Sequence, residues 1–179
     1  MFFGVAVMVS LMAMVGLDFT TYQQLTSQQE IIKVHVTETS EGQFTVKVTS
    51  DDSAGEYELV GDQWQIDFRL IRFSPLVSLS GLSYLYQPSR LSNRYQSIDD
   101  QRSKPLFFYS LRDEQAVKLD LWQFFRDYSH RLPMIDATFG SSVFMPLIDN
   151  AEYNILIGFS GLVVKAANEN GLLALQHWQ

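Results

Sequence analysis

The sequence contains no cysteine among its 179 residues. This absence excludes disulfide bonds, zinc sites built on thiolates and thiol nucleophiles, although cysteine-free chains occur in the periplasm and the cytosol alike. Histidine is also scarce. His35, His130 and His177 form no HxxxH pair and have no carboxylate at a ligand spacing. With no glycine-rich phosphate loop and no carboxylate pair in a recognisable active-site context, we expect no metal, no cofactor and no enzymatic activity.

Basic residues are outnumbered, with 13 Lys and Arg against 20 Asp and Glu and a net charge of −7. Residues 18–68 hold ten acids and two bases, whereas residues 69–104 hold six bases and two acids. Because neutralising phosphates requires a sustained basic face, this distribution predicts that nucleic acid is not a partner. A hydrophobic content of 46% predicts one folded domain with a short appendage.

The longest apolar run is at the start of the chain. Met1–Leu17 carries no charge, and Phe19 and Tyr22 follow as aromatic residues suited to a membrane interface. A helix of 22 residues would be about 33 Å long, enough to cross a hydrocarbon core of about 30 Å. The run therefore predicts a single transmembrane anchor.

Two alternatives apply to the same run. A cleaved signal peptide would need a basic start and small residues at a cleavage site, and a buried core helix is rarely so uniformly apolar. We expect an anchor over residues 1–22, a polar connector over 23–30 that extends the helix, a β-rich domain over 31–167 and a tail over 168–179.

The domain is predicted to be organised around residues 61–73. A Gly61-Asp62 turn leads into a segment that alternates two faces, which predicts a central strand. Residues 31–39, 44–48 and 56–60 alternate in the same way and are separated by short turns. These four segments predict an antiparallel meander, with the Trp64 strand as its last and longest member.

The rest of the chain has a looser pattern. Short strands are expected over residues 82–87, 95–98 and 106–110, separated by Pro88 and by the polar segment 99–104. A helix with an aromatic stripe is expected over 120–132. A hairpin is expected around Ser160-Gly161, and leucines of the tail could dock on the domain or on a partner. The predicted fold is mainly β: a sandwich- or barrel-like antiparallel domain with one short covering helix.

Candidate interaction residues come from three features. The basic segment Arg90–Lys104 either binds an anionic headgroup or glycan, or pairs with acids such as Asp67 and Asp136. The stripe of Trp122, Phe124, Phe125 and Tyr128 is either a partner surface or the core side of a helix. The candidates are Trp64, Asp67, Arg69, Arg90, Arg94, Tyr95, Trp122 and Asp136, all with a structural or interaction role.

A hydrolase is the remaining chemical alternative. Ser141 or Ser142 with His130 and Asp136 would supply the residue types of a catalytic triad, but residues 139–143 do not form a nucleophile elbow.

Six motifs together resemble an uncharacterised Gram-negative bacterial family often labelled "cation/multidrug efflux pump" or "multidrug transporter". They are Gly61–Asp67, Arg90–Tyr95, Leu121–Trp122, Leu132–Asp136, Gly140–Pro146 and Gly161–Leu162. The resemblance covers roughly residues 15–166 and implies an inner-membrane anchor that carries a periplasmic domain. The family pattern has another hydrophobic span and a basic loop ahead of the position of Met1, so the periplasmic orientation rests on the resemblance alone.

The expected function is a non-enzymatic, membrane-tethered accessory or assembly subunit for an integral membrane protein complex. One hydrophobic span cannot enclose a translocation path, which argues against the transporter label itself. The alternatives are an envelope module that binds lipid or glycan, and a component associated with an efflux or transport system.

Overall fold

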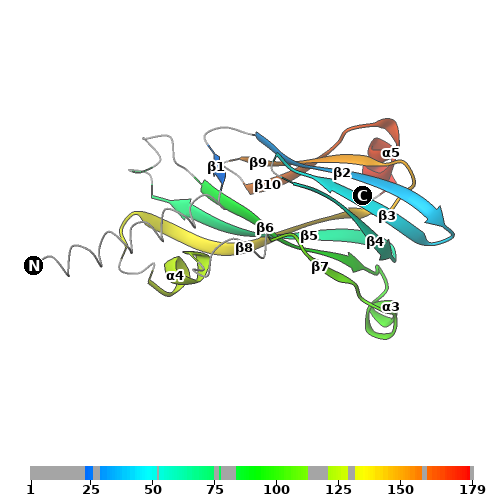
Figure 1. The fold of residues 1–179 in the computed structure, drawn as a ribbon, viewed down its shortest axis with the longest axis horizontal. Helices are drawn as coiled ribbons and strands as arrows, with labels where there is room; N and C mark the ends of the chain where they lie inside the picture. The colour runs from blue at the N-terminus through cyan, green and yellow to red at the C-terminus, as the bar shows by residue number, and fades with distance from the viewer. Residues whose placement is uncertain are drawn as a thin grey trace, which may run out of the picture. The chain divides into compact units, whose positions relative to one another are not determined.

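The computed structural model, drawn as a ribbon in Figure 1, describes residues 23–25, 29–51, 53–74, 77, 84–112, 121–128, 132–158 and 161–177. Within these ranges, no helix has the length and the apolar character needed to cross a bilayer. The predicted anchor, residues 1–22, lies outside the described residues.

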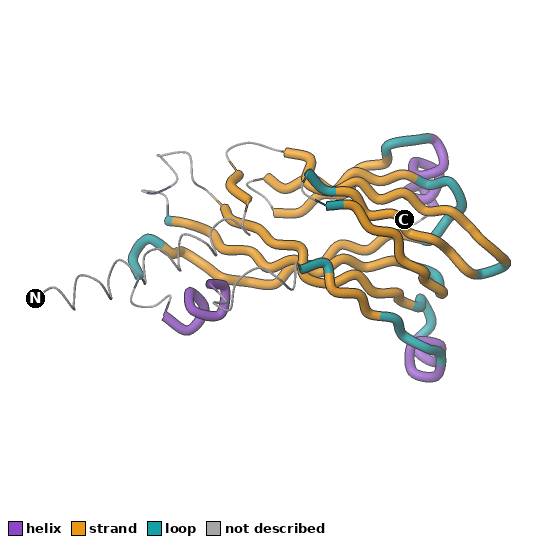
Figure 2. The backbone as a smooth tube through the Cα atoms, viewed as in Figure 1, coloured by secondary structure: helices purple, strands orange, loops and turns teal. Residues whose placement is uncertain are grey.

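Most of the described backbone is strand, as Figure 2 shows, so the mainly-β prediction is confirmed. The elements are β1 (Gln23–Leu25), β2 (Gln29–Ser40), β3 (Gln43–Thr49), β4 (Ala54–Val60), β5 (Gln63–Phe73), β6 (Tyr84–Arg94), α3 (Ile98–Ser103), β7 (Phe108–Ser110), α4 (Leu121–Tyr128), β8 (Ile135–Pro146), β9 (Glu152–Gly158), β10 (Gly161–Ala166) and α5 (Glu169–His177). The predicted connector holds β1 and the start of β2 instead of a helix extension. The helices α3 and α5 were not predicted.

The chain divides into two compact units. Unit 1 comprises Met1–Thr26, Phe68–Pro88 and Arg112–Gly140, and unit 2 comprises Ser27–Asp67, Ser89–Leu111 and Ser141–Gln179. The strands β5, β6 and β8 contribute residues to both units.

One sheet lies within unit 2 and has the strand order β10-β9-β2-β3-β4. The predicted hairpin between β2 and β3 is confirmed, because Ser40 pairs with Gln43 across a two-residue loop. Gly42 occupies that loop with a φ of 71°, a conformation that glycine adopts without steric cost. Alternate side chains of β2 and β3, such as Val34 and Val46, are buried, as the period of two predicts.

The strand β5 does not extend this meander. It is an interior strand of the second sheet, whose order is β1-β6-β5-β8 with β7 also pairing with β6. The prediction of a central strand is therefore confirmed, but the predicted four-strand meander ends at β4. Nor is β5 the longest strand, with 11 residues against 12 in β2. The turn at Gly61 has a φ of 122°, which favours glycine and redirects the chain after β4.

The strand β6 also differs from the prediction, because it runs through Pro88 without a break. On one edge, β1 pairs with residues 84–86 and β7 with residues 90–92. Pro88 lies between these two paired segments, where its missing N–H removes no hydrogen bond of either ladder. Residues 95–98, predicted as a strand, instead lead into α3.

The core of unit 2 is built from the inward-facing residues of both sheets. Trp64 of β5 and Tyr153 of β9 are fully buried, and their rings meet edge-to-face with centroids 5.6 Å apart. The hydroxyl of Tyr153 donates to the backbone oxygen of Pro146 at 3.1 Å, and burial raises the pKa of Tyr153 to about 12. This ring therefore stays neutral throughout the physiological range.

The core of unit 1 combines strand residues with one helix. Phe125 of α4 packs with Ile71, Phe73, Leu85 and Ile135, and Trp122 contributes a partly buried ring. The helix thus covers a sheet face through these two side chains. The other half of the predicted stripe is exposed, since Phe124 and Tyr128 keep 44% and 47% of their surface accessible.

The predicted tail forms α5, which docks on β9 and β10. Gly171 and Ala174 are buried there, whereas Leu172 and Leu173 are exposed. The buried small residues allow the helix backbone to approach the sheet closely.

Candidate functional site

Unit 2 carries a polar sheet face around Asp67. Arg90 of β6 donates to Asp67 Oδ2 from Nε at 2.9 Å and from Nη2 at 2.7 Å. The other oxygen, Oδ1, accepts from Ser142 Oγ of β8 and from Gln65 Nε2, each at 2.7 Å. The predicted pairing of Arg90 with Asp67 is thus present, and both carboxylate oxygens are engaged. A carboxylate held in this way has a structural role and is poorly suited to act as a general base.

The hydrogen bonds decide the ionisation of Asp67. Burial raises the pKa of Asp67, but donation by Ser142, Gln65 and Arg90 and the charge of Arg90 outweigh this effect, so the pKa lies below the ordinary value of 3.8. A depressed pKa means that the unfolded chain binds this proton more tightly. The carboxylate therefore stabilises the fold fully above about pH 4, and the contribution is lost as the pH falls through the folded pKa.

We expect Ser142→Ala to lower the free energy of unfolding by about 0.5–1.5 kcal/mol at pH 7, since one hydrogen bond to a carboxylate is lost. The loss should shrink as the pH falls through the folded pKa of Asp67, which lies below 3.8, because protonation of Asp67 weakens the same bond in the wild type. Urea unfolding of the full chain at pH 7 and at a series of acidic pH values measures the effect. Ser141→Ala is the matched control and should change little. A loss that stays the same down to the acid unfolding of the chain would contradict this role for Asp67.

The other predicted pairings differ from the expectation. Arg94 lies over the ring of Phe144, with 4.4 Å from Cζ to the centroid, and no carboxylate pairs with it in the described part of the chain. Asp136 pairs instead with Arg72, within unit 1. The predicted pairing of Arg94 with an acid is therefore wrong, because these acids are already held by Arg90 and Arg72.

Two further candidates lie together in unit 1. Arg69 lies over the indole of Trp122, with 5.1 Å from Cζ to the ring centroid, and Arg126 lies over the same ring at 5.0 Å. The contact of Arg69 with Trp122 attaches β5 to α4, whereas the contact of Arg126 lies within α4. Arg69 thus contributes to the packing of unit 1, and the Asp67 group is made by other residues.

The serine-triad alternative gains no geometric support. The hydroxyl of Ser142 donates to Asp67, and Asp136 is held by Arg72. His130 lies outside the described residues. Among the residues that the structure describes, no group of three or more His, Asp and Glu side chains is arranged to hold a metal ion.

An open hollow of about 310 Å³ lies in unit 2. Its lining residues are Gln63, Arg94, Gln96 and Phe144. Gln63 begins β5 and is among the buried polar residues. No periodicity distinguishes a glutamine that lines a hollow from one that faces solvent.

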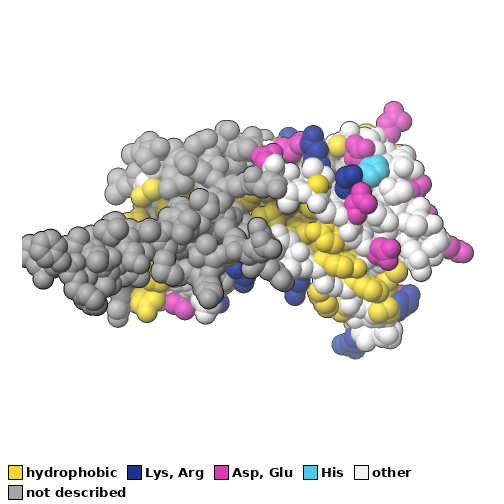
Figure 3. Space-filling view, in the orientation of Figure 1, with side chains coloured by type: hydrophobic (Ala, Val, Ile, Leu, Met, Phe, Trp, Pro, Cys, Tyr) yellow, Lys and Arg dark blue, Asp and Glu magenta, His cyan; other side chains and the backbone are white. Residues whose placement is uncertain are grey.

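Unit 2 also exposes an apolar surface, which we call the β7 surface: Ile98, Leu106, Phe107 and Phe108. Their exposed fractions are 70%, 38%, 37% and 56%. Figure 3 shows a band of hydrophobic side chains where Figure 1 places β7. The sequence signal was the run Leu106–Tyr109, which predicted a strand but not its exposure.

The β7 surface is held rigidly by Asn93, a buried side chain of β6. Its Nδ2 donates to the backbone oxygens of Val60 at 2.7 Å and of Pro105 at 3.1 Å. Its Oδ1 accepts from the backbone N–H of Phe107 at 2.6 Å. On the other side, Tyr109 donates its hydroxyl to the backbone oxygen of Glu58 at 2.9 Å. The backbone that carries the exposed phenylalanines is therefore held by hydrogen bonds before any partner binds.

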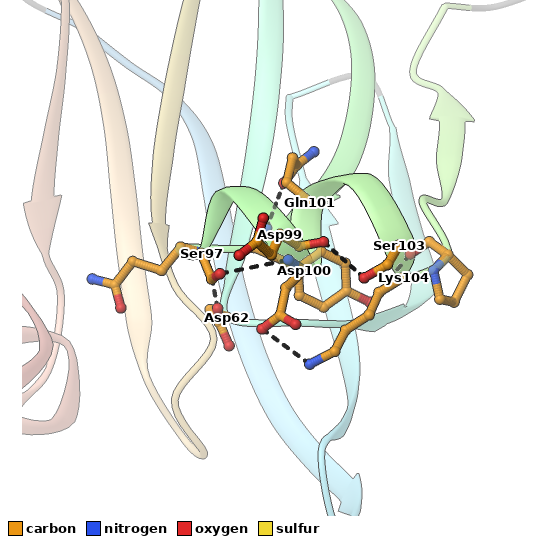
Figure 4. A network of polar contacts seen from close by, with 10 residues as sticks. Asp62, Ser97, Asp99, Asp100, Gln101, Ser103 and Lys104 are labelled. Atoms are coloured by element: carbon orange, nitrogen blue, oxygen red, sulfur yellow. Dashed lines mark hydrogen bonds and ion pairs between the residues drawn. The ribbon is translucent and has the colours of Figure 1, made fainter.

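The helix α3 braces the same segment, as Figure 4 shows. Ser97 caps the helix by accepting from the N–H of Asp100, and Lys104 pairs with Asp100 at 3.1 Å. The backbone N–H of Tyr95 donates to Gln101 at 2.7 Å. Tyr95, the remaining candidate, is thus buried at the base of this brace, and its hydroxyl donates to the backbone oxygen of Pro105.

Comparisons of the chain with protein-family models, with curated proteins and with solved structures find no match. The family resemblance of the motifs therefore remains an expectation from the sequence.

Proposed function

We propose that this chain is a membrane-tethered, non-enzymatic accessory or assembly subunit that uses the β7 surface to bind an integral membrane protein. The observation that carries the proposal is the rigid exposure of Phe107 and Phe108 beside Leu106 and Ile98. A contiguous apolar patch costs solubility when it is left in water, and aromatic residues are enriched in the cores of protein interfaces.

The position of β7 supports the same proposal. It is a three-residue strand that pairs with β6, and such a short edge resists uncontrolled strand pairing. Its backbone, held by Asn93 at Phe107, would lose little conformational entropy on binding. A preorganised surface of this kind suits a lasting contact with one partner.

The membrane part of the proposal rests on the uncharged run Met1–Leu17 and on the family resemblance. In this arrangement the protein is anchored in the inner membrane, and its β-rich part lies in the periplasm next to the periplasmic surface of the partner. The engaged carboxylate of Asp67 supports a role without chemistry.

We expect the double variant Phe107→Ser/Phe108→Ser to lose its partner. The tagged full chain would be purified in mild detergent from membranes of its native host, and the partner quantified by mass spectrometry. Hot-spot aromatics contribute about 2 kcal/mol or more each, so recovery of one polytopic membrane protein should fall at least tenfold.

The matched control is Phe124→Ser/Tyr128→Ser, which changes two exposed aromatic residues of α4 and should leave recovery unchanged. Thermal melts of both variants test that they fold. A wild-type protein that consistently migrates alone would overturn the proposal, and equal recovery with the β7 variant would exclude this surface.

A further inference from the structure

The helix α4 exposes two aromatic side chains. Phe124 and Tyr128 are four residues apart, so they lie on the same face of the helix, and their ring centroids are 5.1 Å apart. Their exposed fractions are 44% and 47%, whereas the adjacent Phe125 is buried. Met134, which directly precedes Ile135 of the same hydrophobic cluster, is 48% exposed. We call Phe124, Tyr128 and Met134 the α4 surface.

The α4 surface lies close to the strand that follows the N-terminal apolar run. Gln24 of β1 is the register partner of Leu85 in β6, and such partners lie about 5 Å apart. The side chain of Leu85 belongs to the same hydrophobic cluster as Phe125 of α4. One strand pairing and one shared cluster therefore connect β1 to α4, and all of these residues lie within unit 1.

The length of the chain limits how far β1 can lie from a membrane. The uncharged run ends at Leu17, and only residues 18–22 separate it from β1. Even when fully extended, a segment of this length spans only about 20 Å. With Met1–Leu17 as the membrane anchor of the proposed function, β1 is held within that distance of the bilayer. The helix α4, which shares a cluster with the neighbour of β1, is then held close to the bilayer too.

The distribution of charge favours unit 1 for a contact with lipid. Unit 1 has six acids and six bases, whereas unit 2 has fourteen acids and seven bases. The whole net charge of −7 therefore belongs to unit 2. Because anionic headgroups repel an acidic surface, unit 1 is the part of the chain that can rest on an anionic bilayer.

We infer that the α4 surface rests in the headgroup region of the bilayer, which gives the protein a second membrane contact beside its anchor. Tyrosine is enriched in this region, and a helix with one apolar side places that side into it. Two rings bind a bilayer weakly on their own, but the anchor confines them near it, so the contact forms at a high effective concentration. The inference rests on the anchor of the proposed function and does not depend on the β7 surface.

The absence of cysteine makes the test specific, because one introduced cysteine takes the only spin label. The full chain carries a label at Tyr128→Cys or at Met134→Cys, in vesicles of phosphatidylethanolamine and phosphatidylglycerol. Electron paramagnetic resonance measures the accessibility of each label to oxygen and to a nickel complex, and hence its depth. Both labels should lie about 5–10 Å inside the headgroup boundary. The matched control is Leu172→Cys, which is 50% exposed in the acidic unit 2 and should stay in water.

A second measurement tests whether the two rings make the contact. Phe124→Ser/Tyr128→Ser, combined with the label at Met134→Cys, should move that label from lipid into water while the anchor keeps the chain on the vesicles. Thermal melts show that the variant folds. The same double change remains the control for partner recovery, because detergent replaces the lipid in that purification.

The outcomes separate this inference from the proposed function. If the wild-type chain does not float with the vesicles, the anchor is wrong and both proposals fail. If it floats but the labels at Tyr128 and Met134 are as accessible to the nickel complex as the label at Leu172, only this inference is wrong. It is also wrong if the double change leaves the Met134 label in lipid, or if spin–spin broadening shows that a second copy covers α4.

Discussion

Trp64→Ala is expected to lower the free energy of unfolding by about 3–5 kcal/mol, the largest effect of any substitution considered for this chain. Trp64 is fully buried in unit 2, and its ring packs edge-to-face on Tyr153 of the facing sheet. Alanine would leave a cavity between the two sheet layers, because the strands on either side are held by their ladders and cannot close it. A folded domain has only about 5–15 kcal/mol in total, so the variant should be close to unfolding at physiological temperature.

The control substitution is Trp64→Phe. The indole Nε1 of Trp64 is buried without a hydrogen-bond partner, so phenylalanine removes an unpaired polar group while it keeps most of the ring. We expect a loss well below that of alanine. Urea unfolding of the full chain, followed by near-ultraviolet circular dichroism, measures both. A loss below about 1 kcal/mol for Trp64→Ala would mean that the two layers do not depend on this ring.

The sequence predicted local structure well wherever the side-chain period and the turn residues agreed. Residues 31–48 form the predicted hairpin because β-branched residues alternate and Gly42 fits the loop. The same reasoning failed at β5. The period of β5 shows which of its faces is buried but not which strands are its neighbours, and β5 pairs in the other sheet.

Long-range pairing also explains the strands that were missed. The strand β8 contains Gly140, Ser141 and Ser142, a composition typical of loops, and it becomes a strand because it lies beside β5. Similarly, Pro88 indicated a break, and β6 continues through it because the neighbouring ladders leave a gap there. In both strands tertiary context outweighs local propensity.

Among the candidate sites, too, some contacts could be predicted from the sequence and others depend on the fold. The pair of Arg90 and Asp67 was one of two alternatives that the sequence offered for the basic segment, because acids are plentiful around that segment, and the structure contains this pair. The β7 surface and the hollow could not be predicted, since both depend on exposure. Phe107 and Phe68 look alike in sequence, and only the fold shows that one is exposed and the other buried.

Gly171→Ala tests whether geometry outweighs helix propensity at the docking of α5. In an exposed helix this change is stabilising by about 0.5–1 kcal/mol, because alanine restricts the unfolded chain. Here the added Cβ would lie 2.4 Å from the backbone oxygen of Glu152 in β9, far inside van der Waals contact. The obstacle is backbone that also accepts a bond from Ala167, so it cannot easily move. The steric clash should therefore outweigh the gain in helix propensity and lower the free energy of unfolding by about 1–3 kcal/mol.

The hydrogen bonds of Asn168, beside Gly171, oppose the movement of α5 that would relieve this clash. Asn168 Oδ1 accepts from the backbone N–H groups of Gly171 at 2.8 Å and of Glu152 at 3.1 Å, so one side chain fixes the start of α5 to the start of β9. If α5 moved outward to accommodate the methyl group, both bonds would lengthen. Leu172→Ala, at an exposed position of the same helix, should stay within about 0.5 kcal/mol of the wild type. A higher melting temperature for Gly171→Ala would show that α5 is not packed against β9 in solution, because only an undocked helix would gain from alanine.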